Sequence, residues 1–270
     1  MGSFSKIKKF KKVVWGYYKK EGRVFQWRKT KNSYEILVSE FMLQQTQTNR
    51  VEKKYEEFIK KFPTVRSLAD ASLKEVLETW QGLGYNRRAL YLWRSAQEIV
   101  KKHGGKIPIV YNKLVTLPGI GPSTAGAVCA FAFNVPIPFI ETNIRRAIIY
   151  FFFSDLRSVS DKKIFTIVVE SMDIKNPREW YWALMDYGAT LAKREKENPN
   201  KKSKHYVKQS KFEGSRRQAR GKIMRELLLG PKKFLQLQKK LNLSPELTRE
   251  LIGEMKKEGM VKEKNGKVFL

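Results

Sequence analysis

The sequence is nearly free of cysteine, since Cys129 is the only one among its 270 residues. A single thiol excludes an intramolecular disulfide and any metal site built from several cysteines. Cys129 lies in the small, apolar segment 127–131, which indicates a buried core residue. The two histidines, His103 and His205, lie in polar, basic segments, and no cluster of His, Cys, Asp and Glu has the spacing of zinc ligands. We therefore expect no metal site.

Long apolar runs are also missing. No segment is long and apolar enough to span a membrane, and no signal peptide is evident. The sequence therefore predicts an intracellular protein, either cytoplasmic and nucleoid-associated or nuclear, with no membrane partner.

Acidic residues are scarce: the chain has 26 Asp and Glu but 55 Lys and Arg, which leaves a net charge of +29. A surplus of this size indicates a polyanionic partner, most commonly nucleic acid. The alternative is an ion-pairing surface of the thermophilic kind, but such surfaces normally balance Lys with Glu. Residues 1–30 carry ten Lys and Arg with one Glu, and residues 201–270 carry twenty with seven Glu. We expect the two ends to contact nucleic acid and the middle to hold the core and the chemistry.

Alternation of apolar and polar residues with a period of two is almost absent before residue 258, whereas helical spacing recurs throughout. With 41% apolar residues, the sequence predicts a globular, all-α main body. The helices are expected at about Phe4–Lys20, Ser33–Thr48, Asn49–Lys61, Ser67–Ala71, Leu73–Trp80, Arg87–His103, Tyr111–Thr116, Ser123–Phe133, Asn143–Phe153, Asp161–Met172 and Pro177–Lys193.

A second, smaller domain is expected after the polar, Lys-rich segment 194–214. Three further helices are predicted, at Arg216–Leu229, Lys232–Leu241 and Pro245–Glu258. Asn265-Gly266 is a strong two-residue hairpin turn between the flanking strands Met260–Lys264 and Lys267–Leu270. Three helices followed by a hairpin predict a small winged helix-turn-helix.

A glycine hairpin, Leu117–Gly121, is the first motif with a chemical meaning. Gly119 and Gly121 permit close approach of the backbone to a phosphate, and the amides that begin the next helix can point at that anion. An ordinary turn between helices is the alternative. Glu141 follows Gly121 by 20 residues, at the start of another helix. A hairpin that can bind a phosphate is thus followed, one helix later, by a carboxylate.

The second motif is Ser39–Gln47, in which a carboxylate precedes consecutive glutamines. Glu40 lies among apolar residues, so burial would raise its pKa and suit it to donate a proton at neutral pH. The alternative is a solvated glutamate on a helix surface.

Several separated motifs, in this order and at these intervals, resemble the MutY-type adenine DNA glycosylases of the helix-hairpin-helix superfamily. They are Phe25–Arg28, Ser39–Gln47, Phe62–Val65, Gly82–Tyr85, Leu117–Gly121 and Ser123–Gly126. The resemblance covers about residues 24–190. It implies a glycosylase domain in residues 1–210, with a six-helix barrel lobe at about 34–145 and a second lobe from 1–33 and 146–210. The winged helix would then occupy residues 211–270.

The resemblance also implies the catalytic roles. Glu40 matches the glutamate that protonates N7 of adenine, and Glu141 stands where an aspartate stabilises the cationic sugar. Asn143 matches the asparagine that orients this site. Ser123 stands where lyase relatives such as endonuclease III carry a nucleophilic lysine. Because serine forms no Schiff base, a monofunctional glycosylase is expected.

For DNA, the resemblance implies that Gln45 fills the gap left by the flipped base and that Tyr85 intercalates beside the opposite base. Base flipping needs such a plug and such a stacking surface. The expected partner is double-stranded DNA with a mismatch or lesion, bound by a monomer. The expected DNA contacts are Gln44, Gln45, Thr46, Tyr85, Arg87, Arg88, Gly119, Gly121, Ser123 and Thr124.

The chain departs from the family pattern in three places. Glu141 replaces the aspartate. The segment 190–214, where the family usually holds an iron–sulfur cluster through four cysteines, contains none, so no cofactor is expected. Lysines and arginines of this segment are expected to contact DNA instead. Residues 215–270 are too short and too helical for the Nudix-like domain that reads 8-oxoguanine in the family.

The expected function is therefore excision of adenine opposite 8-oxoguanine or guanine. One alternative is a thymine or uracil mismatch glycosylase of the same superfamily, although a pyrimidine has no N7 for Glu40 to protonate. The other is a non-catalytic DNA-binding homologue in which the change from Asp to Glu abolished the chemistry. Retention of Glu40, Gln45, Tyr85 and Asn143 argues against simple decay.

Overall fold

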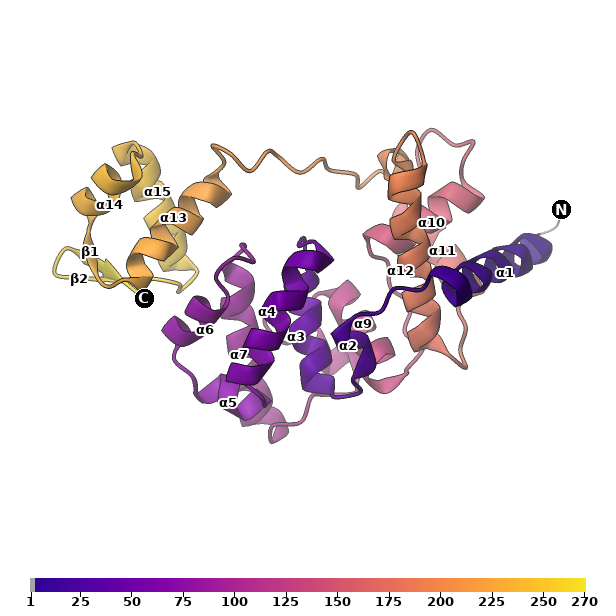
Figure 1. Cartoon of the computed structure of the whole chain (residues 1–270), viewed down its shortest axis with the longest axis horizontal. Coiled ribbons are helices and arrows are strands. Elements are labelled where there is room, and N and C mark those ends of the chain that lie inside the picture. Colours follow the sequence, from indigo (N-terminus) through magenta and orange to yellow (C-terminus); the bar gives the residue numbers. More distant parts are fainter. Residues whose placement is uncertain (1–2) are drawn as a thin grey trace. The chain divides into compact units, whose positions relative to one another are not determined.

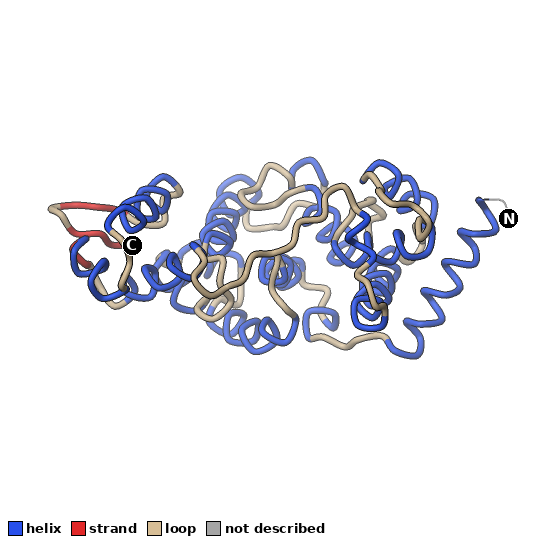
Figure 2. Tube along the Cα trace, turned by 90° about the horizontal axis from the view of Figure 1, so that it is seen from above, coloured by secondary structure: helices blue, strands red, loops and turns tan. Residues whose placement is uncertain are grey.

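The computed structural model describes residues 3–270, so the first two residues of the expected glycosylase domain lie outside the described part (Figure 1). The main body is built from helices joined by loops, and the strands lie near the C-terminus (Figure 2). The body's helices are α1 (Ser3–Glu21), α2 (Gln26–Lys29), α3 (Ser33–Leu43), α4 (Thr48–Lys61), α5 (Val65–Asp70), α6 (Leu73–Thr79), α7 (Arg87–His103), α8 (Tyr111–Leu114), α9 (Pro122–Phe133), α10 (Thr142–Phe152), α11 (Asp161–Ser171), α12 (Pro177–Arg194) and the 3-10 helix η1 (Pro199–Lys202). The predicted all-α body is confirmed. None of the described helices has the length and apolar character that crossing a membrane requires.

Local sequence explains several helix ends. Thr64 with Ser67 and Ser72 with Glu75 form capping boxes at the starts of α5 and α6. Gly104 ends α7 in the left-handed conformation, with φ of 60°. The predicted helix 33–48 is interrupted instead: α3 ends at Leu43 and α4 begins at Thr48. The break separates Glu40, which lies on α3, from the loop of residues 44–47, here called the glutamine loop.

The described C-terminal segment contains α13 (Arg216–Leu228), α14 (Phe234–Leu241) and α15 (Pro245–Lys257), with β2 (Lys262–Lys264) and β3 (Lys267–Phe269). The predicted winged helix is thus confirmed, with one correction. Lys232 and Lys233 form a short strand, β1, rather than the start of a helix, because they pair with β3 in the sheet order β1-β3-β2. Asn265 and Gly266 both have positive φ, as a two-residue hairpin turn requires.

The chain divides into two compact units. The first contains the chain up to Glu40, Pro108–Thr116 and Ile120–Lys208; the second contains Phe41–Ile107, Leu117–Gly119 and Gln209–Leu270. Both candidate catalytic glutamates therefore belong to the first unit. The glutamine loop, Tyr85 and the winged helix belong to the second. The sequence-based division at residue 210 stays a prediction.

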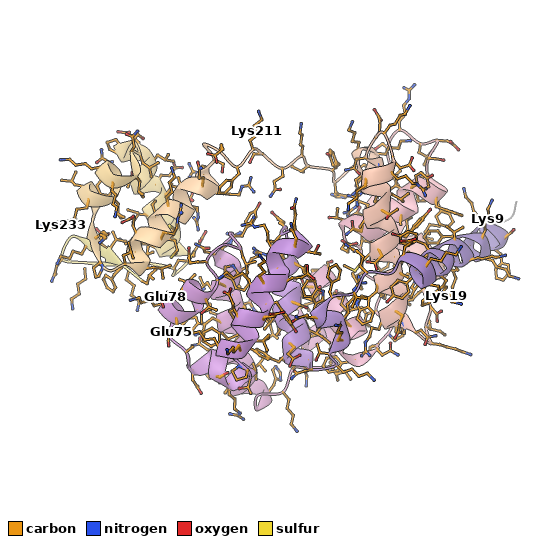
Figure 3. All side chains as sticks on the ribbon, viewed as in Figure 1. Lys9, Lys19, Glu75, Glu78, Lys211 and Lys233 are labelled. Carbon is orange, nitrogen blue, oxygen red and sulfur yellow. The ribbon has the colours of Figure 1, made fainter. Side chains whose placement is uncertain are left out.

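In the first unit, α10 and α1 both pack against α12. Gly188 of α12 lies so close to α10 that a Cβ there would be 2.0 Å from the carbonyl oxygen of Asn143. On α1, Phe10 and Val14 are fully buried, and the Phe10 ring packs edge-on to Trp180 of α12 with centroids 6.1 Å apart. The apolar face of α1 thus closes the unit, while lysines such as Lys9 and Lys19 extend from the helix (Figure 3).

Candidate active site and DNA-binding loops

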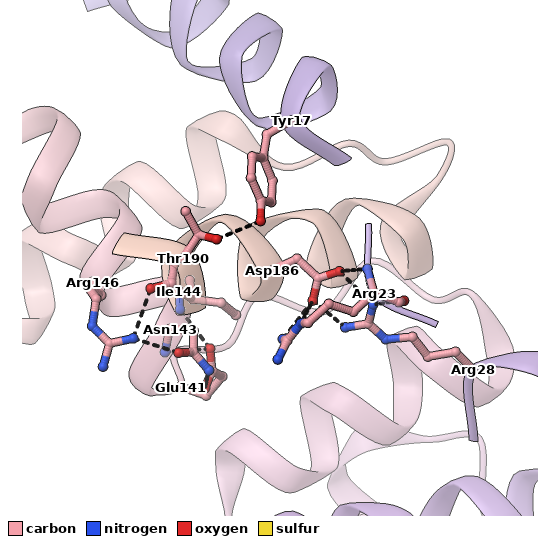
Figure 4. A network of polar contacts seen from close by, with 10 residues as sticks. Tyr17, Arg23, Arg28, Glu141, Asn143, Ile144, Arg146, Asp186 and Thr190 are labelled. Carbon is pink, nitrogen blue, oxygen red and sulfur yellow. Dashed lines mark hydrogen bonds and ion pairs between the residues drawn. The ribbon is translucent and has the colours of Figure 1, made fainter. Parts of the chain in front are cut away.

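Glu141 is the N-cap residue of α10 (Figure 4). Its Oε1 accepts hydrogen bonds from the backbone N–H groups of Asn143 and Ile144, each at 2.7 Å, and its Oε2 accepts one from Nδ2 of Asn143 at 3.2 Å. A negative charge is favourable at a helix N-terminus, where amide groups lack intrahelical partners. The longer glutamate side chain therefore still fulfils a capping role in which shorter residues are more common.

Arg146 fixes the orientation of Asn143. Its Nη1 donates to Oδ1 of Asn143 at 2.7 Å and to the carbonyl oxygen of Gly188 at 2.9 Å, while its Nε donates to Oδ1 of Asn198 at 3.1 Å. Because the guanidinium only donates, Oδ1 of Asn143 must face it, which turns Nδ2 toward Glu141. The sequence reasoning missed Arg146; its place one turn after Asn143 on the same helix was the available signal.

The environment of Glu141 contains opposing influences. Burial is the largest influence and leaves the pKa of Glu141 above its ordinary value, although the backbone N–H groups of Asn143 and Ile144 and the positive charges of Arg146 and Arg145 oppose this rise. These four groups all favour the carboxylate form at a partly buried position. These partners support a preorganised negative charge inside the protein, as the stabilisation of a cation requires.

Glu40 lies in the same unit with a different environment. Although part of its surface is accessible, the surrounding protein raises the pKa of Glu40 to about 8, first through burial and second through the negative charge of Glu141. The positive charge of Arg28 opposes this shift. At neutral pH the Glu40 carboxyl is therefore mainly protonated. The partners of Glu141, by contrast, favour its carboxylate form. Two carboxyl groups in unlike environments are the pattern of an acid and a charge stabiliser.

Arg28 is held by Asp186 of α12. Its Nη1 and Nη2 donate to the two carboxylate oxygens of Asp186, both at 2.8 Å, and Arg23 donates through its backbone N–H at 2.8 Å and Nε at 2.7 Å (Figure 4). Asp186 is buried. Arg28 also lies over the rings of Phe25 and Trp182, at 5.2 and 5.4 Å from their centroids. Arg28 lies within a motif of the sequence, but the sequence alone assigned a role neither to it nor to Asp186.

In the second unit, Arg88 connects the glutamine loop to the loop that contains residues 83 and 84. Its Nη1 donates to the carbonyl oxygens of Phe41, Met42 and Gln44, and its Nη2 donates to Oγ1 of Thr46 at 2.9 Å. Nη2 also reaches the carbonyl oxygens of residues 83 and 84. Burial lowers the pKa of Arg88 to about 10, which still leaves it charged at neutral pH. In this structure the Arg88 guanidinium supports the loops, and the predicted direct contact with DNA would require this network to open.

The two loops present residues in strained conformations. Gln45 and Tyr85 have φ values of 56° and 48°, in the left-handed region that non-glycine residues rarely adopt. Gln45 is exposed and Tyr85 is half-buried. Gln44 donates through Nε2 to the carbonyl oxygen of Gly119 at 3.4 Å, which connects the glutamine loop to the hairpin. Arg87, the first residue of α7, is exposed.

The hairpin glycines differ in what they require. Gly119 has φ of 74°, and a Cβ there would lie 2.6 Å from Cβ of Tyr91, so only glycine fits. Gly121 has an ordinary extended backbone and is the exposed N-cap of α9, with open space where a Cβ would point. Ser123 and Thr124 are half-buried in the first turn of α9. A phosphate could thus approach the start of this helix.

Within residues 3–270, no group of three or more His, Cys, Asp and Glu side chains could hold a metal ion. The segment that follows α12 is organised by asparagines. Nδ2 of Asn200 donates to the carbonyl oxygen of Thr142 at 2.9 Å, and Oδ1 of Asn198 accepts from Arg146 and from the backbone of Asn200. This turn therefore contacts the beginning of α10. The predicted absence of an iron–sulfur cluster from this segment stays a prediction.

Comparison with known proteins agrees with this fold. Residues 38–170 match the family described as HhH-GPD superfamily base excision DNA repair protein. The chain belongs to this superfamily, and within it to the MutY type. It is 36% identical over 186 residues to the adenine DNA glycosylase of Buchnera aphidicola subsp. Acyrthosiphon pisum (strain APS), covering 67% of this chain and 53% of that protein.

A second relative is the adenine DNA glycosylase of Mycobacterium tuberculosis (strain ATCC 25618 / H37Rv), 41% identical over 133 residues, with 49% of this chain and 44% of that protein covered. Among solved structures, a thermostable thymine-DNA glycosylase superposes with a TM-score of 0.66 at 24% identity, over 73% of this chain and 92% of that one. This likeness shows the fold. The chain spans about half the length of the curated relatives it matches.

Proposed function

We propose that the protein is a monofunctional DNA glycosylase that excises adenine from mismatches with 8-oxoguanine or guanine. The observation that carries this proposal is the pair of unlike carboxyl groups in the first unit. The pKa of Glu40 is raised to about 8, and Glu141 is held by amides and arginines that favour its charged form. An acid and a fixed anion are the two groups that cleavage of a purine glycosidic bond requires.

In the proposed reaction, the Glu40 carboxyl donates its proton to N7 of adenine. The electron pair of the bond between C1′ and N9 then leaves with the base. The negative charge of Glu141 stabilises the cationic sugar, and water adds to C1′ while its proton passes to a carboxylate. Ser123 cannot attack C1′ as an amine would, so the reaction ends at an abasic site without strand cleavage.

DNA is the proposed partner, on the strength of the +29 charge and the exposed hairpin glycines. Gln45 is proposed to fill the gap left by the flipped adenine, and Tyr85 to stack beside the opposite base. Lysines of the segment after α12, such as Lys211, project from the ribbon and would contact phosphates (Figure 3). The protein would act as a monomer without an iron–sulfur cluster, at the nucleoid or in the nucleus.

The alternative substrates, thymine and uracil, fit this pair of carboxyl groups less well. Neither pyrimidine has an N7 for Glu40 to protonate. Single-turnover excision should be measured on duplexes that carry adenine opposite 8-oxoguanine or guanine, and thymine or uracil opposite guanine. Adenine release that exceeds pyrimidine release supports the proposal, and preferential release of thymine or uracil contradicts it. Glu141→Gln is the matched control for contaminating activity.

A further inference from the structure

The second unit contains a cleft of about 840 Å3. One wall comes from the glutamine loop and the start of α7, and the other comes from residues 209–212 and helices α13 and α15 of the winged helix. The side chains that matter most for recognition are Gln45, Tyr85, Arg87, Gln209, Arg217 and Arg220. The proposed DNA-binding loop and the C-terminal domain therefore share one cavity.

Tyr85 is the point at which the two walls meet. Its phenolic oxygen accepts hydrogen bonds from Nε2 of Gln209 and Nη1 of Arg217. The guanidinium carbons of Arg217 and Arg88 lie 5.3 and 5.4 Å from the centre of its ring. A second Nη of Arg217 donates to the carbonyl oxygen of Ser210 at 2.7 Å. The Arg217 guanidinium is thus positioned beside an aromatic platform by at least two oxygens.

Glu258, at the end of α15, connects the winged helix to α7 through hydrogen bonds. Its carboxylate accepts from Arg220 and, at 3.4 Å, from Arg87, while its carbonyl oxygen accepts from Nη2 of Arg94 at 3.0 Å. The next residue is Gly259, where a Cβ would lie 2.4 Å from the Arg94 guanidinium. The absence of a side chain at this position lets Arg94 reach the backbone. These contacts hold α13, and with it Arg217, at a defined place beside Tyr85.

The chemistry of the cleft suits a purine nucleotide. An aromatic face stacks with any base, a guanidinium donates to O6 of guanine or 8-oxoguanine, and a carboxamide can donate to or accept from N7. N7 is an acceptor in guanine and carries a proton in 8-oxoguanine, and the Gln209 amide can pair with either after rotation. The carboxylates that line the cleft, Glu254 and Glu258, both pair with Arg220; Glu254 also pairs with Arg216, and Glu258 with Arg87. The remaining arginines leave the cavity positive, as a nucleotide requires.

We infer that the winged helix completes a binding site for the nucleotide opposite the excised adenine, with Arg217 and Gln209 as the residues that select a purine there. On binding, the donors that now hold the Tyr85 phenol would transfer to the purine edge, and the ring would be free to stack. This inference rests on the proposed function for the identity of the opposite base. It assigns the lesion-reading role to this domain in place of a Nudix-like domain.

The test measures affinity without chemistry. The full chain is titrated with duplexes carrying 2′-fluoro-2′-deoxyadenosine, which resists excision, opposite 8-oxoguanine, guanine, cytosine or thymine. Arg217→Met keeps the length of the side chain and removes its donors. We expect this variant to lower the preference for purines over pyrimidines about tenfold, in line with the loss of one bidentate contact. Gln209→Ala, in an exposed segment where folding is not at risk, should reduce the distinction between guanine and 8-oxoguanine.

Arg225→Met is the charge-matched control, because Arg225 lies exposed on the same helix and does not line the cleft. This variant should lower the affinity for all four duplexes by one common factor. An equal loss of affinity for all four duplexes with Arg217→Met would indicate that Arg217 contacts only a phosphate. This result would overturn the inference. Tighter binding of all four would also overturn it, by showing that the winged helix only obstructs the cleft. Failure of wild type to excise adenine, with the purine preference intact, would contradict the proposed function alone.

Discussion

The negative charge of Glu141 raises the pKa of Glu40, although the two residues are 101 positions apart in the chain. Glu40 comes from α3 and Glu141 caps α10, within one compact unit. Burial is the larger cause of this raised pKa, and the same charge that would stabilise a cationic sugar adds to it. One residue thus has two electrostatic effects, and its removal should change both.

Glu141→Gln should lose at least about 10²-fold in the single-turnover rate of adenine excision, because the cation loses its fixed counter-charge. The carboxamide can still accept hydrogen bonds from the backbone amides of α10, so the fold and DNA affinity should change little. Rapid-quench measurement at saturating enzyme reports the rate. Activity within a factor of a few of wild type would remove Glu141 from the proposed mechanism.

Glu40→Gln should abolish adenine release, since the amide donates no proton to N7. In wild type, the single-turnover rate should stay level below the raised pKa of about 8 and fall as pH increases through it. The variant's residual rate should show no such fall. A wild-type rate that rises through this pH range would indicate that Glu40 acts as a base.

The same pKa predicts a pH dependence of stability. A carboxyl whose pKa is higher in the folded state than in the unfolded state binds its proton more tightly when folded. Its stabilising contribution is complete below the unfolded pKa of about 4.5 and is lost as pH rises to about 8. Between these limits, the free energy of unfolding of wild type should fall relative to that of Glu40→Gln. Urea titrations of both proteins at several pH values measure the difference, and parallel curves would contradict a raised pKa.

Gly188→Ala should damage the site from a distance. The added Cβ would meet the carbonyl oxygen of Asn143 at 2.0 Å, so α10 and α12 must separate. We expect a loss of about 1–3 kcal/mol in the free energy of unfolding and reduced excision, because Glu141 moves with α10. Gly253→Ala on α15 is the control, since its Cβ enters open space and alanine favours the helix. Equal stability of both variants would show that α10 and α12 are not closely packed at Gly188.

The purified protein should be colourless and active without iron, because Cys129 alone cannot supply the four thiolates of a cluster. Metal analysis and the visible absorption spectrum check this directly, and treatment with a chelator should leave excision unchanged. Stoichiometric iron with a cluster-like absorption band would contradict the prediction.

Several features followed from the sequence alone. Helical periodicity located most helices of the body to within a few residues, although it did not predict α2 or η1. Asn265-Gly266 located the hairpin, because spacing and turn chemistry act over short distances. The glycines of the hairpin motif and the buried environment of Glu40 could also be anticipated from their neighbours. Pairing of Lys232 with β3 could not, because a two-residue strand forms only where a distant partner exists.

Tertiary structure decided the rest. That Arg146 holds Asn143, that Asp186 binds two arginines and that Arg217 meets Tyr85 depends on helices far apart in the chain. The sequence determined which donors, acceptors and charges were present and the periodicity that folds them into helices. Which of them meet was decided by packing, because burial and charge act through space, and only the folded chain determines those distances.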